Sequence, residues 1–353
     1  MIRKRRKLSI VAVDLFCGVG GLTYGLQKSG IKVVAGVDVD EKCKFAFEEN
    51  NGASFIHKSI KDITSKEISK LYPAESLMVL VGCAPCQPFS KHTQKEKDRE
   101  TKDDWGLLYH FLKLIKEVEP NVVSMENVPQ IIKHTVFSDF VDGLKSKGYY
   151  INWQNVYCPD YGIPQNRRRL VLLASQLGEI KLIAPTHKPE NYKTVKMAIG
   201  NLEPIKAGSS SKKDRLHKSA TLSKVNLERI RKSVPGGSWR DWDENLRTDC
   251  HRQESGDTYS SVYARMRWDK PSPTITTQFF SYGTGRFGHP EQDRALSIRE
   301  GAILQTFPKK YKFLLSNSPV ELRKLGRYIG NAVPVRLGEI IGKSIVKHFE
   351  DHL

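Results

Sequence analysis

The feature that most constrains the fold is a regular alternation of short apolar runs and helical patterns in the first 175 residues. The apolar, β-branched runs lie at 9–15, 33–37, 77–81, 121–125 and 170–173, and the helical patterns lie at 22–29, 41–50, 107–118 and 136–147. Alternating units of this kind predict a mostly parallel sheet with helices on both faces. We therefore expect an α/β fold whose ligand crevice lies at the carboxyl ends of the strands.

The second half of the chain loses this rhythm. Polar segments rich in proline, glycine or serine occupy 184–189, 206–213 and 235–237, and helical patterns return at 297–304 and 335–349. Such composition is typical of loops and turns. The sequence therefore predicts a first domain at 1–176, completed by a C-terminal helix at 327–353, and a second, smaller and irregular domain with a hinge at 177–326.

Charge points to the kind of partner. The chain carries 57 lysines and arginines against 39 acidic residues, a formal net charge of +18. Residues 1–176 contribute +6 of this charge and the rest of the chain contributes +12. A strongly basic balance favours a polyanionic partner such as nucleic acid. A solvated surface would explain any single lysine, but it does not explain the difference between the halves.

Other sequence features bear on the compartment. The longest apolar runs are strand-sized, well below the about 18 residues that a membrane-spanning helix needs. The basic start is not followed by the apolar stretch of a signal peptide, because Asp14 interrupts it. Six cysteines are scattered, and a chain of 353 residues has no need of disulfide bonds to fold. We expect a cytoplasmic protein that contacts no membrane.

A glycine turn at 14–21 (DLFCGVGG) joins the first apolar run to the first helical pattern. It matches neither the dinucleotide-binding fingerprint nor a P-loop. Asp38 stands at the end of the second run, where a carboxylate can accept hydrogen bonds from ribose hydroxyls. The turn is therefore either a ligand-binding loop or a tight structural turn.

Three further motifs follow later runs. Cys83 and Cys86 form a C-x-x-C pair, which is half of a zinc site, a redox pair, or a pair containing one nucleophilic thiolate. Glu126 ends the run at 121–125 and is either a crevice carboxylate or an exposed strand end. Three arginines at 167–169 precede the last run, and they either orient a carbonyl or phosphate or form a plain basic turn.

In this order the segments resemble the C5-cytosine-specific DNA methyltransferases, in particular the bacterial modification enzymes that carry no added regulatory domain. The resemblance covers nearly the whole chain and rests on 14–21, 85–90 (PCQPFS), 126–128 (ENV), 165–169 (QNRRR) and 330–334 (GNAVP). It implies the Rossmann-like α/β fold of S-adenosylmethionine-dependent methyltransferases for the catalytic and cofactor-binding domain. It also implies that the second, irregular domain is the target-recognition domain.

The resemblance implies four catalytic residues. The Cys86 thiolate would add to carbon 6 of a flipped-out cytosine and so make carbon 5 nucleophilic. Glu126 would hold N3 and the exocyclic amine of the base, and Arg169 would hold its O2 carbonyl. Arg167 would contact phosphate or steady the loop. Extrusion of the base from the duplex costs a few kcal/mol, which phosphate contacts of the basic second half can offset.

S-adenosylmethionine is the implied methyl donor, and no metal is expected. Phe16 would pack against the adenine, and Asp38 would bind the ribose. Val39 stands where the family often has an aromatic residue that stacks on adenine, so we expect a lower affinity for the cofactor. The residues implied to bind the cofactor are Phe16, Gly18, Gly20, Gly21, Asp38, Val39, Asp62, Ile63, Pro85, Leu108, Asn331 and Ala332.

Two positions depart from the family pattern. Cys83 stands where the family usually has the glycine of Gly-Pro-Pro-Cys or Gly-Phe-Pro-Cys, and the two thiols could oxidise together. Trp105 precedes Gly106 where the family has Arg-Gly, and Arg99 or Lys102 could take over the missing contact. The candidates for DNA binding are Ser90, Arg99, Lys102, Arg229, Arg231 and Arg240.

The sequence thus predicts an enzyme that methylates carbon 5 of a cytosine in a specific short duplex DNA sequence. We expect a monomer associated with the bacterial nucleoid, serving beside a cognate restriction endonuclease. Three alternatives remain: a methyltransferase of the tRNA-acting branch, a basic DNA-binding module that retains an inactive methyltransferase fold, and a thiol oxidoreductase. The target sequence is not readable from the chain, because a base contact and a phosphate contact look the same in one sequence.

Overall fold

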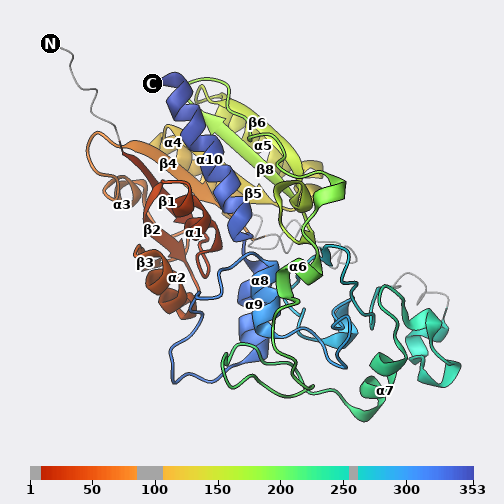
Figure 1. The fold of residues 1–353 in the computed structure, drawn as a ribbon. Coiled ribbons are helices and arrows are strands. Elements are labelled where there is room, and N and C mark those ends of the chain that lie inside the picture. Colours follow the sequence, from red (N-terminus) through yellow and green to blue (C-terminus); the bar gives the residue numbers. More distant parts are fainter. Residues whose placement is uncertain (1–8, 86–105, 254–260) are drawn as a thin grey trace. The chain divides into compact units, whose positions relative to one another are not determined.

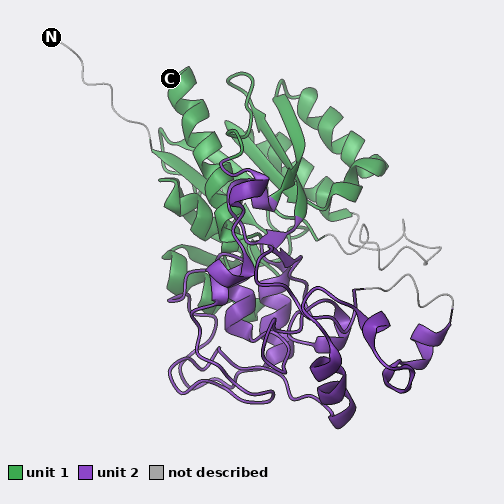
Figure 2. Ribbon diagram, turned by 45° about the vertical axis from the view of Figure 1, so that its right-hand side comes forward, with its two compact units in different colours: residues 1–157, 168–185, 333–353 green, residues 158–167, 186–332 purple. Residues whose placement is uncertain are grey.

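The structure is a computed structural model, and it describes residues 9–85, 106–253 and 261–353. The contacts divide the chain into two compact units, which are coloured in Figure 2. The first unit comprises residues 1–157, 168–185 and 333–353, and the second unit comprises residues 158–167 and 186–332. The sequence instead predicts boundaries at 176 and 326, and the functions given there to the two domains remain predictions.

The first unit contains seven of the described strands and six of the described helices. The strands are β1 (Ile10–Leu15), β2 (Lys32–Asp38), β3 (Ser54–His57), β4 (Leu77–Gly82), β5 (Val122–Asn127), β6 (Tyr150–Tyr157) and β8 (Arg168–Ser175). The helices are α1 (Gly21–Lys28), α2 (Lys44–Asn51), α3 (Ser65–Ser69), α4 (Gly106–Val118), α5 (Thr135–Lys145) and α10 (Val335–His352).

These strands form one sheet in the order β3-β2-β1-β4-β5-β8-β6 (Figure 1). The pairs from β3 to β5 are parallel, whereas β8 runs antiparallel to both β5 and β6. The expectation of a mostly parallel α/β sheet is therefore confirmed. The strand order reverses direction between β1 and β4, which is the kind of switch point at which open α/β sheets bind ligands.

The central strands are continuous apolar runs because both faces of the sheet are covered. Residues 11–15 of β1 and residues 79–82 of β4 are buried throughout. The core on one face includes Val13, Leu80 and Val123 from the strands, packed with Phe111 of α4 and Phe140 of α5. This packed scaffold fixes the positions of the strand ends, which carry the candidate site.

One predicted helix is divided in the structure. The sequence predicts a single helix at 41–50, but a 3-10 turn at Glu41–Cys43 precedes α2. Asp40 caps this turn by accepting a hydrogen bond from the backbone N–H of Lys42 at 3.2 Å. Gly52 ends α2 with a φ of 59°, a left-handed conformation that favours glycine.

Helix α10 packs on α1 through glycines (Figure 1). A Cβ added at Gly25 would lie 2.3 Å from the carbonyl oxygen of Val335, and one added at Gly338 would lie 2.8 Å from that of Leu22. An ion pair between Lys28 and Glu339, 2.9 Å long, crosses the same contact. The two helices thus approach more closely than larger side chains would allow.

The second unit contains little regular structure, as the sequence predicts. Its described elements are the short strands β7 (Gln165–Asn166) and β9 (Ser272–Pro273) and the helices α6 (Val195–Ile199), α7 (Lys224–Lys232), α8 (Ile298–Leu304) and α9 (Leu322–Asn331). The two strands pair in parallel. With so few backbone ladders, side-chain contacts must hold much of this unit together.

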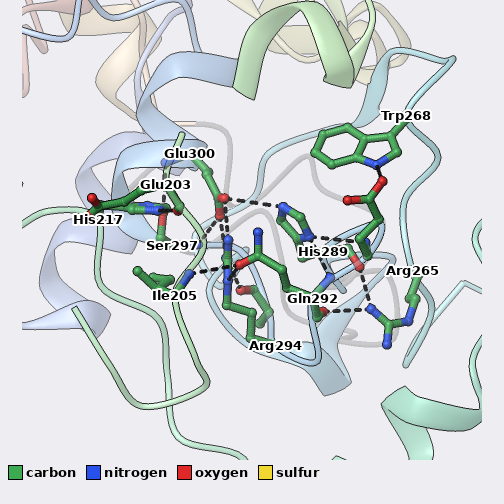
Figure 3. A network of polar contacts seen from close by, with 12 residues as sticks. Glu203, Ile205, His217, Arg265, Trp268, His289, Gln292, Arg294, Ser297 and Glu300 are labelled. Atoms are coloured by element: carbon green, nitrogen blue, oxygen red, sulfur yellow. Dashed lines mark hydrogen bonds and ion pairs between the residues drawn. The ribbon is translucent and has the colours of Figure 1, made fainter. Parts of the chain in front are cut away.

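A buried polar network supplies part of this support (Figure 3). The Arg294 guanidinium donates to both carboxylate oxygens of Glu300, at 2.8 and 2.7 Å, and both side chains are buried. The backbone N–H of Ser297 donates to Glu300 at 2.7 Å and so caps α8. Gln292 accepts from the Arg294 Nε at 2.8 Å. A buried ion pair is tolerated when its remaining donors and acceptors are satisfied in this way.

An aromatic cluster forms the core of the region that includes α7. Trp239 stacks on His251 with ring centroids 4.2 Å apart. Trp242 and Tyr282 are also buried there, and the Trp242 Nε1–H and the Tyr282 hydroxyl both lie within hydrogen-bond distance of the Ser233 hydroxyl. Aromatic residues therefore give this loop-rich region a core of its own.

Candidate active site

The glycine turn follows β1 directly and leads into α1. Phe16, Gly18 and Gly20 have positive φ angles of 60°, 49° and 85°. A Cβ added at Gly18 would meet no described atom within 4 Å, so the space beside this residue is open. Gly21 is buried and begins α1. The turn therefore offers backbone to a ligand without side chains in the way.

Asp38 ties this turn to the end of β2. Its two carboxylate oxygens accept hydrogen bonds from the backbone N–H groups of Gly18, at 2.8 Å, and of Asp40, at 2.9 Å. Burial raises the pKa of the Asp38 carboxyl above its usual value. The next side chain, Val39, is 63% exposed. An acid and an exposed apolar side chain thus stand side by side at the carboxyl end of a parallel strand.

Asp14 lies beneath the turn, and the sequence analysis gave it no role. Its carboxylate is buried and accepts a hydrogen bond from the Thr23 hydroxyl at 2.6 Å, while its Oδ1 has no hydrogen-bond partner among the described residues. Burial raises the pKa of Asp14 from 3.8 to about 7. An acid inside an otherwise apolar strand is the signal that could have drawn attention to it.

Two further predicted cofactor residues, Ile63 and Leu108, lie in the buried core of the first unit. Asp62 is exposed, and its backbone N–H donates to the Ser59 carbonyl at 3.0 Å. Pro85, the last described residue before the gap, is half-buried. These residues all follow strands of the same sheet or, in the case of Leu108, belong to the first turn of α4.

A carboxylate and a guanidinium meet at the carboxyl end of β5. Glu126 is 3% exposed, and its Oε1 lies 3.0 Å from the Arg169 Nε on β8. The two atoms are at ion-pair distance, although their angle is not that of a hydrogen bond. The pairing of Glu126 with Val171 across the two antiparallel strands brings these side chains together.

Cys83 reaches the same carboxylate from the other side. Its Sγ lies 2.8 Å from the Glu126 Oε2, and its backbone N–H donates to the Leu15 carbonyl at 3.3 Å. From the sequence, Cys83 is a member of a C-x-x-C pair and a departure from the family pattern, and no contact with Glu126 is predicted for it. The sequence signal that could have drawn attention to Cys83 is its place just after the apolar run at 77–81, because residues that follow neighbouring parallel strands emerge at the same edge of the sheet.

Arg167 belongs to the second unit. Its guanidinium donates to the Ile275 carbonyl at 3.0 Å and lies 3.4 to 3.5 Å from the Gly330 carbonyl, and the side chain is buried. Asn331 is the exposed last residue of α9, and the Ala332 carbonyl accepts from the Gln305 side chain at 3.0 Å. These contacts all lie within the second unit.

The basic candidates in the second unit differ in their surroundings. Arg229 donates to the Leu246 carbonyl at 2.8 Å, and its guanidinium lies over the rings of Trp242 and Tyr263. Arg231 is exposed and lies 3.3 Å from the Asp293 carboxylate. Arg240 is exposed. Arg231 and Arg240 also contact their own unit, through Asp293 and the Trp239 ring, and Arg229 differs from them in being half-buried.

Four of the residues predicted from the sequence lie outside the described residues: Cys86, Ser90, Arg99 and Lys102. Within the described ranges, no three histidine, cysteine or acidic side chains gather in a way that could hold a metal ion. None of the helices in those ranges has the length and apolar character needed to cross a membrane.

Comparison with known proteins decides the family. Residues 10–347 match the family described as C-5 cytosine-specific DNA methylase. The chain belongs to this family.

Curated relatives and a solved structure agree with this. The chain is 51% identical over 341 residues to the type II methylase M.HgiDII of Herpetosiphon aurantiacus, covering 96% of this chain and 95% of that protein. It is 27% identical to the type II methyltransferase M1.HphI of Haemophilus parahaemolyticus, over 96% of this chain and 87% of that protein. The crystal structure of a protein encoded within an Escherichia coli prophage shares the fold, with a TM-score of 0.72, 22% identity and coverage of 97% and 100%.

The protein is therefore an enzyme, a C5-cytosine DNA methyltransferase, and its family implies S-adenosylmethionine as the methyl donor. The residues present at the switch point suit that molecule. Gly18 leaves open space beside the turn, Asp38 offers carboxylate oxygens of the kind that bind hydroxyl groups, and the exposed Val39 offers an apolar surface. Gly18, Asp38 and Val39 thus form a candidate cofactor site on the first unit of the methylase, which we call the cofactor cradle.

Proposed function

We propose that this methyltransferase acts on carbon 5 of a cytosine that is flipped out of a specific short duplex DNA sequence, by way of a covalent bond between Cys86 and carbon 6 of the base. The observation that carries the proposal is the contact between Glu126 and Arg169 at the carboxyl edge of the sheet. Strand β4 ends at the same edge and continues within four residues to Cys86. A nucleophile, an acid and a guanidinium are thereby assigned to one edge.

The proposed role of Cys86 is to make carbon 5 of the cytosine nucleophilic. Carbon 5 of cytosine is too electron-poor to attack a methyl group directly. Addition of a thiolate to carbon 6 breaks the ring double bond and places electron density on carbon 5, which then accepts the methyl group. Loss of the carbon 5 proton and elimination of the thiolate restore the aromatic ring and the enzyme. Cys86 lies outside the described residues, so its role rests on the family resemblance.

Glu126 serves as the group that binds the edge of the base at N3 and the exocyclic amine. Its burial suits this role because a carboxyl group removed from water makes stronger hydrogen bonds to a bound base. A proton handed to N3 as the thiolate adds offsets the negative charge that the ring acquires. The neighbouring Arg169 serves as the donor to the O2 carbonyl, for which a planar guanidinium is suited.

Arg167 serves to steady its loop. Its guanidinium lies against backbone carbonyls of Ile275 and Gly330, so it is already supplied with acceptors inside the second unit. A side chain held in this way fixes the start of the arginine run. We assign it no direct contact with the base.

S-adenosylmethionine supplies a methyl group bound to a positively charged sulfur. The Asp38 carboxylate serves to accept hydrogen bonds from ribose hydroxyls, and Phe16 and Val39 serve as apolar surfaces for the adenine. The open space beside Gly18 accommodates the methionine part next to the backbone. The other first-unit residues that the resemblance assigns to cofactor binding are Gly20, Gly21, Asp62, Ile63, Pro85 and Leu108. The resemblance also assigns cofactor binding to Asn331 and Ala332, which belong to the second unit.

Residues 177–326 serve as the target-recognition domain and hinge. The excess positive charge of the second half supports this, because phosphate contacts can offset the few kcal/mol that base flipping costs. Arg231 and Arg240 are exposed, so they are better placed than Arg229 to reach DNA. Because the two curated relatives named above bear type II methylase names, we further propose that the protein acts beside a cognate restriction endonuclease. A monomeric state stays a prediction from the sequence.

A trapping experiment tests the covalent mechanism. Bisulfite sequencing of DNA from cells that express the protein identifies the methylated site. Duplexes carrying 5-fluorocytosine at that site are then incubated with the protein and S-adenosylmethionine. We expect an irreversible protein–DNA adduct, because fluorine cannot leave as a proton does.

Matched variants locate the chemistry. Cys86→Ala is expected to abolish both the adduct and methyl transfer, whereas Cys250→Ala, a change at an exposed cysteine, should leave both unchanged. Labelled methyl groups found in tRNA and not in duplex DNA would defeat the substrate assignment. Methylation of DNA with no adduct at the fluorinated site would defeat the covalent step alone.

A further inference from the structure

The carboxylate of Glu126 on β5 contacts one residue of the neighbouring strand β8 and one residue that directly follows the other neighbouring strand, β4. Arg169 approaches Oε1 from β8, and Cys83 approaches Oε2 from the end of β4. The two partners leave the carboxylate little freedom to rotate, since each oxygen faces a different group. Only the arginine was expected from the family resemblance, in which a glycine stands in place of Cys83.

The position of Cys83 is fixed by its backbone as well as by its side chain. Its N–H donates to the carbonyl of Leu15 at the end of β1, so the residue extends the β1–β4 pairing by one step beyond Gly82. Its side chain is half-buried and points to Glu126, from which it is separated by 43 positions in the sequence. A backbone held in the sheet can aim a short side chain with little loss of entropy.

Chemistry assigns the direction of this hydrogen bond. A carboxylate has no hydrogen to give, so the thiol S–H donates to Oε2. A glycine at this position has no side chain with which to donate, and an alanine could only pack. The other oxygen, Oε1, accepts no hydrogen bond from the described residues and lies beside the Arg169 guanidinium. The carboxylate thus has one oxygen that accepts a hydrogen bond from the thiol and one that lies at ion-pair distance from a guanidinium without accepting a hydrogen bond.

We propose that Cys83 is a positioning residue for the reaction, whose thiol holds Oε2 of Glu126 so that Oε1 is presented to the cytosine ring. The proposal rests on the proposed function, in which Glu126 binds the base. The donated hydrogen bond also stabilises the carboxylate form, which is the form that Glu126 reaches when it gives a proton to N3. The contribution of Cys83 therefore increases as the thiolate of Cys86 adds to the base, and it acts on the chemical step more than on DNA binding.

The test compares three variants of the full-length protein in methylation of a duplex that contains the mapped site. Cys83→Ala removes the donor, Cys83→Ser replaces it with a hydroxyl donor of similar size, and Cys250→Ala is the control at an exposed cysteine. We expect Cys83→Ala to lower kcat about tenfold, as expected when a hydrogen bond to a charged acceptor is removed, while KM for DNA changes less than about twofold. Cys83→Ser should recover most of kcat.

The serine variant distinguishes positioning from packing. A hydroxyl keeps the donor to Oε2, so a positioning role predicts that kcat recovers in Cys83→Ser while KM for DNA stays unchanged. A packing role would leave Cys83→Ser close to Cys83→Ala, because neither variant restores the sulfur atom. Thermal melting of each variant shows whether the fold is kept, and KM-against-kcat comparisons are made on variants that melt like the wild type.

The outcomes separate this inference from the proposed function. Wild-type protein that methylates the duplex, together with a Cys83→Ala variant of unchanged kcat, would overturn the role of Cys83 and leave the proposed function standing. A serine variant as impaired as the alanine variant would also overturn it, because the hydroxyl keeps the donor. A wild-type protein that methylates no cytosine would overturn the proposed function itself.

Discussion

At the scale of single residues, the site consists of carboxylates whose surroundings differ. Both carboxylate oxygens of Asp38 accept hydrogen bonds, and those of Glu126 face a hydrogen-bond donor and a guanidinium. The Oδ1 of Asp14, in contrast, has no hydrogen-bond partner among the described residues. A buried carboxylate with an unpaired oxygen is costly when it is charged. Asp14 is therefore the acid near the cofactor cradle whose charge should matter most to stability.

Asp14→Asn tests this through the pH dependence of stability. Burial raises the pKa of Asp14 from 3.8 to about 7, so the folded protein binds a proton that the unfolded chain releases between these two values. Stability is therefore fully present below about pH 4 and falls as the pH rises toward 7. Between pH 5 and 8 the wild type should lose about 2 to 3 kcal/mol that the variant keeps.

Denaturant unfolding at several pH values measures this difference. Asp62→Asn, a change at an exposed aspartate that also follows a strand, is the control and should retain the pH dependence of the wild type. Parallel pH curves for Asp14→Asn and the wild type would show that the Asp14 carboxyl does not titrate in this window.

The contacts of single residues were the part least accessible to sequence analysis. Cys83 meets Glu126, 43 positions away, only because β4 and β5 are neighbours in a particular register. Nothing in the local sequence fixes that register. By contrast, the positions of Asp38 and Glu126 at strand ends could be predicted, because each directly follows an apolar run.

At the scale of elements, the central strands were predictable because both of their faces are buried. The runs of β1 and β4 are apolar without interruption, which indicates burial on both sides. Strand β6 was missed because it lies at the edge of the sheet and exposes much of its polar sequence, YINWQNVY. Strand β3 was missed because it has only four residues. Edge position and shortness both remove the periodic signal.

The contact between α1 and α10 yields a prediction at this scale. Gly25→Ala adds a methyl group whose carbon would lie only 2.3 Å from the Val335 carbonyl oxygen, which is closer than real Cβ atoms approach. Since that oxygen is backbone, a helix must move, and we expect a loss of about 1 to 3 kcal/mol of stability.

Gly106→Ala is the matched control, because a Cβ there meets no described atom within 4 Å in the first turn of α4. Thermal and denaturant unfolding of both variants provide the measurement. Equal stability of Gly25→Ala and the wild type would mean that α1 and α10 tolerate a wider spacing than the structure has.

The buried pair of Arg294 and Glu300 yields another prediction. Burial alone would raise the pKa of Glu300, but hydrogen bonds and charge from Arg294 lower it to about 2. The pair therefore stabilises the fold above about pH 4.5, and this contribution is lost as the pH falls toward 2. Glu300→Gln leaves the buried guanidinium without its counter-charge, which should cost about 3 to 5 kcal/mol at neutral pH.

Limited proteolysis and chemical denaturation at pH 7 measure the effect in the second unit. Glu190→Gln, a change at an exposed glutamate of the same unit, is the control and should change stability little. If Glu300→Gln resisted unfolding as well as the wild type, the hydrogen-bonding groups around Arg294 would be sufficient without a negative charge.

At the scale of the whole molecule, charge should govern the association with DNA. A protein of net charge +18 that contacts phosphates releases counterions on binding, so log K falls with log salt concentration at a slope of about −0.9 per phosphate contact. Arg231→Ala or Arg240→Ala should reduce this slope by about one if the side chain contacts phosphate. If it instead contacts a base, the variant should change the sequence preference at one position.

Salt titrations by fluorescence anisotropy, with the mapped duplex and a scrambled duplex, provide the slopes. Lys147→Ala is the control, because this lysine belongs to the first unit and pairs with Glu119 at 2.5 Å. An unchanged slope and an unchanged preference for both arginine variants would assign DNA contact to other residues of the second half.

The glycine contact of α1 with α10 has a consequence for biosynthesis. Lys28 and Glu339 pair although 311 positions separate them, and every residue of the second unit is translated in between. While a ribosome makes those residues, α1 has no α10 to cover its glycine face. The catalytic half of an unfinished chain is thus expected to stay incomplete, and the capacity to modify DNA should arise only once translation has passed the last helix.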